Sequence, residues 1–305
     1  MAQRVITVID PELCTGCGLC VAVCPAETIS LQGGKAAVTG ERSLGCGHCQ
    51  AVCPAGAVRV GSLDPEQARF ASFAPDPRWL PFGQGDPAQL VRLMASRRSC
   101  RNYRARPVPR ELLADLVKIA VTAPSGSNSQ AWSFTVLATR EQVLSLAEGV
   151  GRVMRRFNRL AERAWLRRLL RLVGRPELDD YYREHYQSVA RGLQRWREEG
   201  RDMLFHGAPA AVVVGSLPGA SCPAEDALLA SGHLLLGAHV LGLGSCLIGY
   251  AATVLQKSPD LRAGLGLVPE EEVHAVVALG WPAETYQTQT GRRRPALRWL
   301  PPAES

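Results

Sequence analysis

Cysteine is too sparse in this chain for a disulfide scaffold. Ten cysteines in 305 residues fall far below the density of small disulfide-stabilised secreted domains, which excludes that class. Charged residues make up 21% and hydrophobic residues 46% of the chain, close to the globular average, which excludes a disordered or fibrous protein. Residues 1–6 lack an apolar segment and a small-residue cleavage site, so we expect no secretion signal. The length predicts two domains, one of them small.

Residues 227–255 contain no Lys, Arg, Asp or Glu, a run long enough to suggest a membrane span. However, the run carries His233, His239 and five glycines, and its flanks show no basic bias. We therefore predict a buried helix that ends at residues 242–244, followed by a glycine-containing loop, and we expect no membrane partner. The two histidines are predicted to be core residues with satisfied hydrogen bonds.

A segment near the N-terminus is duplicated. Residues 14–26 read CTGCGLCVAVCPA and residues 43–55 read SLGCGHCQAVCPA, with nine of thirteen positions identical at an offset of 29. In the first copy three closely spaced thiolates can wrap a cubane, and a fourth, followed by proline, points to another cluster. Zinc sites usually show pairs of cysteines, so zinc is the weaker alternative. On these residues the chain resembles bacterial two-[4Fe–4S] ferredoxins over residues 1–62.

This resemblance implies two iron–sulfur clusters, one of which lacks a cysteine ligand. The first would be bound by Cys14, Cys17, Cys20 and Cys53; the second by Cys24, Cys46, Cys49 and residue 43, which is Ser43. Three alternatives stay open. Ser43 ligates through its hydroxyl oxygen, or it leaves one iron open to water, and loss of that iron would give a three-iron cluster. The third alternative is that the substitution is tolerated and an ordinary cluster still forms. The first cluster is therefore expected to be [4Fe–4S] and the second [4Fe–4S] or [3Fe–4S]. Residues 5–9 and 57–60 are predicted to be paired strands.

Residues 63–87 hold five prolines and are predicted to be an extended linker. Asp86 and Pro87 then supply the N-cap and first residue of a helix. Its end runs into RRSCRNY (97–103), in which arginines and serines suit a phosphate. APSGSNSQAW (123–132) lies between a predicted helix (110–121) and strand (133–138) and offers amide and hydroxyl groups to a polar heterocycle.

Together these segments resemble the FMN-dependent nitroreductase family. Three further segments carry the resemblance in family order: DMLFHGAPAAVVVGS (202–216), HVLGLGSCLIGY (239–250), and VVALGWP with GRRRP between 276 and 295. The resemblance implies an α+β chain. A small ferredoxin-like iron–sulfur domain (1–62) and the linker (63–87) precede a nitroreductase-like domain (88–305) with a mixed sheet flanked by helices.

The same resemblance implies a set of FMN-binding residues. Arg97 would contact the phosphate, Arg98 and Ser99 would line the phosphate and ribityl region, and Arg101 would reach the pyrimidine end, where a cation stabilises the reduced flavin. Family sites lie at a dimer interface, so Pro124, Ser125 and Asn128 would come from the second subunit. Ile248 and Gly249 would present a backbone N–H to flavin N5, and Arg292 and Arg294 would close the phosphate site. No residue is identified as a catalytic acid or base.

Residues 151–205 form a basic insert, with fourteen arginines against eight acidic residues, whereas residues 1–62 are neutral. Apolar residues between 153 and 173 fall at helical spacing, and a second helix is predicted from 179 to 201. The insert is either a lid over the flavin or a packed helical hairpin with a solvated basic face. His206 is predicted to be a helix-end or strand-entry histidine, and Cys100, Cys222 and Cys246 buried small hydrophobes.

The sequence therefore predicts a cytoplasmic, homodimeric flavoenzyme. Electrons would enter through the clusters and leave in a two-electron reduction of a small organic acceptor: a nitroaromatic, a quinone or an activated alkene. No glycine-rich dinucleotide fingerprint is present, and a ferredoxin or flavodoxin could dock on the basic face. Two alternatives stay open. One is a non-catalytic iron–sulfur and flavin relay to a partner protein. The other is an iron–sulfur redox sensor binding nucleic acid through the insert, although no recognised nucleic-acid motif is present.

Overall fold

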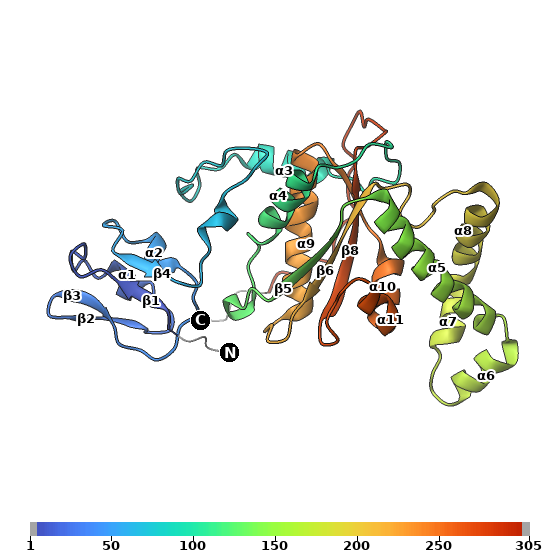
Figure 1. The fold of residues 1–305 in the computed structure, drawn as a ribbon, viewed down its shortest axis with the longest axis horizontal. Helices are drawn as coiled ribbons and strands as arrows, with labels where there is room; N and C mark the ends of the chain where they lie inside the picture. The colour runs from blue at the N-terminus through green and yellow to red at the C-terminus, as the bar shows by residue number, and fades with distance from the viewer. Residues whose placement is uncertain (1–4, 301–305) are drawn as a thin grey trace.

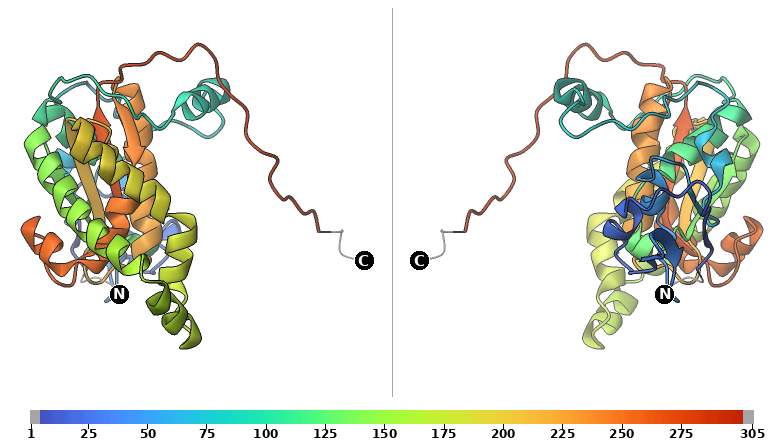
Figure 2. Two further views of the ribbon diagram at one scale, coloured as in Figure 1. Left: turned by 90° about the vertical axis from the view of Figure 1, so that its right-hand side faces the viewer. Right: turned by 90° about the vertical axis from the view of Figure 1, so that its left-hand side faces the viewer.

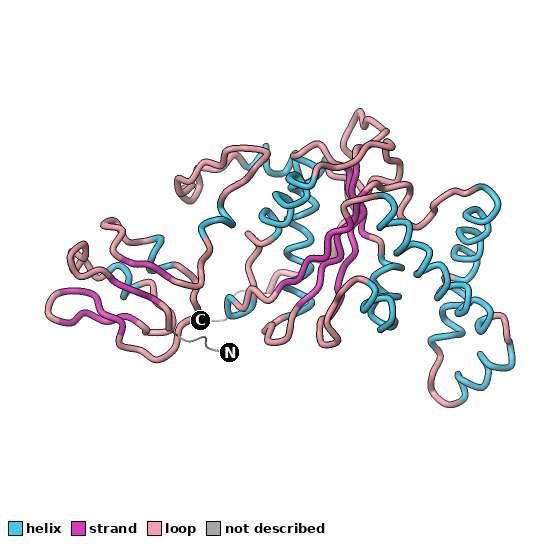
Figure 3. The backbone as a smooth tube through the Cα atoms, viewed as in Figure 1, coloured by secondary structure: helices cyan, strands magenta, loops and turns pink. Residues whose placement is uncertain are grey.

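The computed structural model describes residues 5–300. A small N-terminal part, built of short strands, helical turns and loops, is joined by a long loop segment to a larger α+β part (Figures 1 and 3). Among residues 5–300, no helix has both the length and the apolarity needed to cross a membrane.

The N-terminal part contains two copies of one unit, a single-turn helix that follows a glycine. Its strands pair antiparallel, β1 (Thr7–Ile9) with β4 (Val58–Val60) and β2 (Ile29–Gln32) with β3 (Lys35–Val38). The first pairing confirms the predicted one. The single-turn helices α1 (Leu19–Ala22) and α2 (His48–Ala51) each follow a glycine, Gly18 or Gly47, with a φ of 75°. A side chain other than that of glycine would be strained there, so both copies of the repeat use glycine to begin the helix.

The larger part is built on a four-stranded sheet in the order β5-β6-β8-β7. Its strands are β5 (Trp132–Leu137), β6 (Ala210–Ser216), β7 (Gly244–Leu247) and β8 (Glu272–Gly280). The three strand pairs are antiparallel, and one isolated parallel bridge joins Ser99 to Ser245. β7 corrects the prediction of a loop after residue 244. The short, glycine-containing run gives no strand pattern by itself, and it becomes a strand because β8 supplies its partners.

Helices cover both faces of this sheet, which explains why β6 is buried along its whole length. Alternate residues of β6 and β8 face two cores. On one face they pack against α5 (Arg140–Ala161) and α10 (Gly249–Lys257). On the other they pack against α4 (Arg110–Ala120) and α9 (Pro223–Val240). α9 contains the uncharged run predicted to be a helix, with Glu225 and Asp226 in its first turn, and it ends at Val240, shortly before the predicted end at 242–244. Its His233 Nδ1 lies 2.9 Å from Thr122 Oγ1, but His239 is exposed near its C-terminal end, contrary to its predicted place in the core.

The basic insert is divided into more helices than the sequence predicts. α5 begins at Arg140, where Thr139 and Gln142 form a capping box, and it ends at Ala161. α6 (Ala164–Leu172), α7 (Glu177–Glu184) and α8 (Tyr186–Glu199) follow, so neither predicted span, 153–173 or 179–201, is one helix. Arg167, Arg171 and Arg183 all lie within 3.4 Å of Asp179 carboxylate oxygens. Part of the positive charge of the insert is therefore paired with Asp179 in contacts within α7 and between α6 and α7.

Two exposed segments flank the larger part. α3 (Pro87–Ser96) begins as predicted, because Asp86 Oδ1 accepts hydrogen bonds from the N–H groups of Ala88 and Gln89. The predicted linker contains one short 3-10 helix, η1 (Pro65–Ala68).

Beyond Thr290 the described chain runs away from the body past α3 as an exposed arm (Figure 2). A final helix, α11 (Pro259–Gly264), precedes β8.

Candidate functional site

Residues 97–101, which we call the arginine segment, are extended and run along the start of β7. The backbone turns from helix to extended at Arg97, and Cys100 N–H donates to Ser245 O at 2.9 Å. Successive side chains of an extended segment point to opposite sides. Arg97, Ser99 and Arg101 therefore share one side, and Arg98 takes the other.

The buried thiol of Cys246 marks the side that Arg97, Ser99 and Arg101 share. Burial raises the pKa of Cys246, and these three groups act to lower it because they lie close to the thiol. Cys246 and Cys100 are buried as predicted. The position of Cys246 beside two arginines is not encoded in any local pattern, since it arises from the bridge between the arginine segment and β7 at Ser245.

His206 joins the same group at the end of the sheet where β6 begins. Burial lowers the pKa of its imidazole, Asp202 acts to raise it, and Arg101 acts to lower it. His206 has a φ of 57°, within the left-handed region, and it directly precedes Gly207. This fits the predicted strand-entry position, and the structure adds its proximity to Arg101.

Arg98 is separated from the other members of the arginine segment. Its Nη1 donates to Thr290 Oγ1 at 2.7 Å, and it lines a cavity of about 550 Å³ between α3, β7 and the chain after β8. Arg292 and Arg294 lie beyond Thr290 on the exposed arm. Within one chain, therefore, the structure does not bring these three arginines onto the side of Cys246.

Ile248 and Gly249 form the N-terminus of α10 rather than part of a loop. Ile248 is the N-cap, and its N–H donates to Val276 O at 2.8 Å. Gly249 is the first residue of the helix and is exposed, and a Cβ built there would meet no atom within 4 Å. The first N–H groups of a helix lack partners within the helix. Gly249 is thus the residue of this pair that can offer its N–H to a ligand.

The loop of residues 124–130 is anchored by a buried carboxylate. Asp226, 4% exposed, accepts from Gly126 N–H at 2.8 Å and from Ser129 Oγ at 3.2 Å. Cys222 lies beside this loop and is exposed, which corrects its prediction as a buried residue. Asn128, with a φ of 51°, donates from Nδ2 to Leu44 O in the N-terminal part at 3.0 Å.

The 124–130 loop and the arginine segment lie at opposite ends of the sheet. The loop precedes the start of β5, at Trp132, which pairs with Ser216 at the end of β6. The arginine segment, Cys246 and His206 lie at the end where β6 begins. A six-residue strand spans about 20 Å. A single chain therefore does not bring together the two predicted halves of the site.

Three cysteines of each predicted ligand set lie near one another in the N-terminal part. Burial raises the pKa of Cys20, as does the nearby negative charge of Cys14 and Cys17; the same holds for Cys49 with Cys24 and Cys46. Cys14, Cys49 and Cys53 pack against the small core that contains Cys20, so this core does not separate the two predicted ligand sets. Among residues 5–300, no three His, Cys, Asp or Glu side chains come together as for one metal ion. Thiolates around a cubane are spread over four irons.

Backbone N–H groups point at several of these thiols. Thr28 N–H donates to Cys24 Sγ and Ala57 N–H to Cys53 Sγ, both at 3.3 Å and both four residues on. Ala36 N–H donates to Cys14 Sγ at 3.4 Å and lowers the pKa of that thiol. Ser43 Oγ also accepts a backbone hydrogen bond, from Gly45 N–H at 3.1 Å. Such donors stabilise negatively charged ligands, so the donor set fits iron–sulfur ligation.

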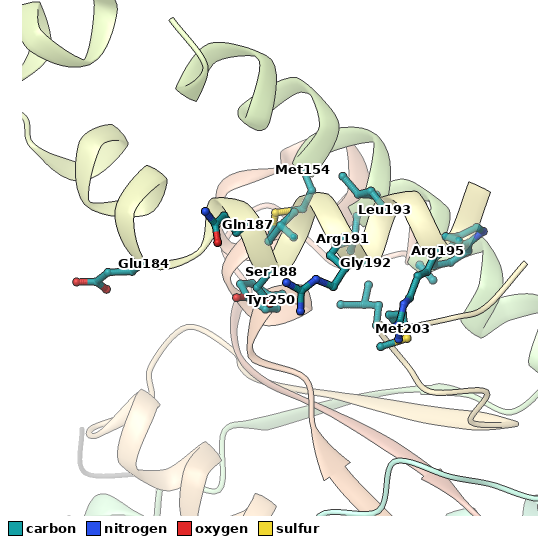
Figure 4. Close-up of a pocket in the computed structure, with 16 residues that line it drawn as sticks. Met154, Glu184, Gln187, Ser188, Arg191, Gly192, Leu193, Arg195, Met203 and Tyr250 are labelled. Carbon is teal, nitrogen blue, oxygen red and sulfur yellow. The ribbon is translucent and has the colours of Figure 1, made fainter. Parts of the chain in front are cut away.

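A further cavity, of about 540 Å³, lies under the basic insert between α5, α8 and the start of α10 (Figure 4). Its walls are mostly apolar, with Val150, Met154, Leu193, Trp196 and Met203 among them. Polar groups come from Arg191, Arg195, Ser188, Gln187, Tyr250 and the carboxylate of Glu184, and Tyr250 directly follows Gly249. The sequence motifs did not reveal this cavity, because three helices far apart in the chain create it.

A redox protein of α+β fold is the class that this arrangement defines. Residues 94–281 match the Nitroreductase family, and residues 6–54 match the 4Fe-4S dicluster domain. The chain belongs to the nitroreductase family and is an oxidoreductase with an N-terminal iron–sulfur domain.

Two curated relatives and one solved structure illustrate the similarity. The NADH dehydrogenase of Thermus thermophilus is 32% identical over 192 residues, covering 62% of this chain and 84% of that protein. A 4-nitrobenzoate reductase of a Nocardioides species is 26% identical over 212 residues, covering 62% and 78%. An FMN-bound nitroreductase of Bacteroides fragilis has a similar fold, with a TM-score of 0.50 and 21% identity over 70% of this chain and 98% of that one.

Proposed function

We propose that this protein is an FMN-dependent oxidoreductase that takes electrons through two iron–sulfur clusters and reduces a small organic acceptor by two electrons. The observation that carries the proposal is the hydrogen bond from Asn128 to Leu44. It joins the loop between Ser43 and Cys46 to a loop that resembles the flavin-binding loop of the family. FMN, when bound, can collect single electrons from clusters and deliver two to an organic acceptor.

The proposed flavin site needs two copies of the chain. Arg97, Ser99 and Arg101 would hold the phosphate and the pyrimidine end beside Cys246, and Gly249 N–H would face N5. The 124–130 loop, with Pro124, Ser125 and Asn128, lies at the other end of its own sheet. A homodimer with a composite site is therefore the proposed assembly. The exposed apolar side chains of α3, Leu90, Val91 and Met94, are available for burial against the second copy.

The exposed arm gives a second reason for a dimer. Residues 291–300 are exposed throughout and include Trp299 and Leu300, which are 85% and 92% exposed. Apolar side chains displayed so fully are expected to pack against another surface. We propose that the arm carries Arg292 and Arg294 to the phosphate end of a site in the dimer.

We propose that the acceptor binds in the cavity under the insert. Its apolar walls suit an aromatic or quinoid ring, and Tyr250 connects it to Gly249. Arg191 and Arg195 stand one helical turn apart on α8 and both line the cavity. Arginine binds carboxylates through paired donors. The proposed acceptors are therefore nitroaromatics or quinones, with a preference for those that carry an anionic group. The insert then acts as a wall of the acceptor site.

We propose domain boundaries that place the cysteine segments and the flavin-site residues in separate domains. The iron–sulfur domain comprises residues 1–62, the linker residues 63–87 and the flavin domain residues 88–305, with the insert at 151–205. We propose that Ser43 faces the second cluster as an oxygen ligand, because its Oγ accepts a backbone hydrogen bond as the cysteine ligands do.

Metal and flavin analysis of anaerobically purified protein tests the proposal, together with turnover from viologen reduced by dithionite. We expect FMN, about eight irons per chain, and reduction of a nitroaromatic or quinone. Flavin-free protein after careful reconstitution would overturn the proposal. Bound FMN without turnover of any acceptor would favour a relay to a partner protein. DNA retention at low salt that weakens as salt rises would favour a redox sensor.

A further inference from the structure

The start of the linker is clamped to its own flavin domain. Asp115 on α4, 1% exposed, accepts hydrogen bonds from Ala71 N–H, Ser72 N–H and Ser72 Oγ at 2.6–3.0 Å. One turn further along α4, Lys118 Nζ donates to Arg69 O at 2.5 Å. The same helix leads into the 124–130 loop. The clamp therefore keeps the iron–sulfur domain close to the loop of its own chain.

The contact between that domain and the loop is made beside the second cluster. Leu44, whose carbonyl accepts from Asn128, lies between Ser43 and Cys46. Asn128 is itself held, because Gln130 Nε2 donates to its Oδ1 at 2.9 Å. The group of Cys14, Cys17 and Cys20 lies against the β2–β3 hairpin through Ala36 and Cys14. That hairpin is on the side of the N-terminal part away from the larger part (Figure 1).

We propose that the cluster of Cys24, Cys46, Cys49 and Ser43 is the exit cluster, and that it reduces the flavin held by the arginine segment of the second copy. This inference rests on the proposed function. The exit cluster lies at the 124–130 loop of its own chain, and this loop completes a site whose Arg97, Ser99 and Arg101 belong to the other chain. Electrons therefore cross the dimer interface between cluster and flavin.

The electron count is balanced by single-electron steps. With the clusters bound, a low-potential one-electron carrier would supply the electrons, and the exit cluster held by Cys24, Cys46, Cys49 and Ser43 would pass them on one at a time. Two such transfers, with protons from solvent, would supply the two electrons that one acceptor molecule consumes. Asn128 is a positioning residue in this scheme, because it fixes the segment next to the exit cluster and exchanges no electrons itself.

Heterodimers of differently tagged chains separate the two routes. One variant, Cys46→Ser with Cys49→Ser, removes the exit cluster, and another, Arg97→Ala with Arg101→Ala, removes flavin binding. The trans heterodimer has one defect on each chain. The cis heterodimer has both defects on one chain and a wild-type partner. The readouts are flavin content, the cluster EPR signal after reduction, and its loss when a nitroaromatic is added.

The inference predicts opposite results for the two heterodimers. Each should bind one flavin per dimer. In the trans heterodimer the exit-cluster signal should disappear on adding the acceptor, with about half of wild-type turnover, because one of its two routes is intact. In the cis heterodimer the cluster signal should persist without turnover. The reverse pattern would overturn the inference and leave the proposed function standing. A wild-type protein that is monomeric or flavin-free would contradict the proposed function instead.

A second variant tests the contact itself in the loaded dimer. Asn128→Asp keeps the size and tolerance of a positive φ but replaces the donor to Leu44 O with a carboxylate. We expect hydrogen exchange of amides 44–47 to rise about fivefold for one lost hydrogen bond, and EPR-detected reoxidation of the exit cluster to slow. Ser127→Asn, an exposed neighbour on the same loop, is the matched control. Unchanged exchange and reoxidation in Asn128→Asp would overturn its positioning role.

Discussion

Asp115 accepts hydrogen bonds from both the N–H and the hydroxyl of Ser72, at 2.7 and 2.6 Å, from a position 1% exposed. Burial alone would raise the pKa of Asp115, but the hydrogen bonds from Ser72 and Ala71 hold it below its usual value. A carboxyl group with a lowered folded-state pKa stabilises the fold above its unfolded pKa, and this stabilisation is lost as pH falls through the folded-state pKa. The clamp is therefore expected to weaken only in strong acid.

Replacing Asp115 with Asn should destabilise the protein by about 1–3 kcal/mol, because an amide group would face the N–H donors of the linker. The shift of the chemical denaturation midpoint at pH 7 measures this effect. Asp76→Asn, at an exposed linker position paired with Arg78, is the control and should change stability by less than about 1 kcal/mol. Equal midpoints for the two variants would show that the clamp contributes little.

Substitution of Ser43 should alter the second cluster alone. Ser43→Cys restores a thiolate and should give a four-iron cluster with a shifted reduction potential and greater resistance to iron loss. Ser43→Ala removes the oxygen ligand and should lower iron toward about seven per chain, with a three-iron EPR signal. EPR and iron analysis of anaerobic samples measure both. Identical spectra for wild type and Ser43→Ala would rule out ligation by the Ser43 oxygen.

The alternation of the arginine segment predicts unequal roles for two adjacent arginines. Arg97→Gln should weaken FMN binding about 10- to 150-fold, as expected for a lost hydrogen bond between charged groups. Arg98→Gln is the matched control, since Arg98 contacts Thr290 on the other side, and its effect should be smaller. Flavin fluorescence titration of the apoprotein measures both affinities. A larger loss in Arg98→Gln would contradict the assignment of sides.

Arg191 on α8 should discriminate acceptors by charge. Arg191→Gln is expected to raise KM for 4-nitrobenzoate about tenfold, with little change for nitrobenzene, because only the carboxylate loses a charged partner. Arg197→Gln is the control, because Arg197 is exposed, pairs with Glu198 and does not line the cavity. Parallel changes for both acceptors would indicate that Arg191 shapes the helix instead of binding the substrate.

His206 should make stability depend on pH in the mildly acidic range. Burial lowers its pKa below the ordinary value of 6.5. The unfolded chain then binds a proton that the folded chain does not, so stability falls as pH drops from 6.5 toward the folded-state pKa. His206→Asn tolerates the positive φ and should reduce the loss of stability between pH 7.5 and 5.5. Denaturation midpoints at the two pH values test this, and equal losses in both proteins would exclude His206 as the cause.

Local chemistry made several elements predictable. The duplicated cysteine segment predicted two ligand groups, and Cys20 lies near Cys14 and Cys17 whereas Cys49 lies near Cys24 and Cys46. Asp86 and Pro87 indicated the start of α3 because capping depends on residues a few positions apart. The family segments likewise indicated the sheet flanked by helices, since each contributes an element near its own residues.

Other features depend on residues that meet only after folding. β7 exists because β8 supplies its hydrogen-bond partners, and Cys246 meets Arg97 and Arg101 because the arginine segment bonds to β7 at Ser245. The cavity beside Tyr250 needs α5, α8 and α10 together. The sequence by itself determined the ligand types and the order of the segments, because these are local. Only the tertiary structure decided that the arginine segment and the 124–130 loop lie at opposite ends of one sheet, because the antiparallel pairing of β5 with β6 separates them by the length of a strand.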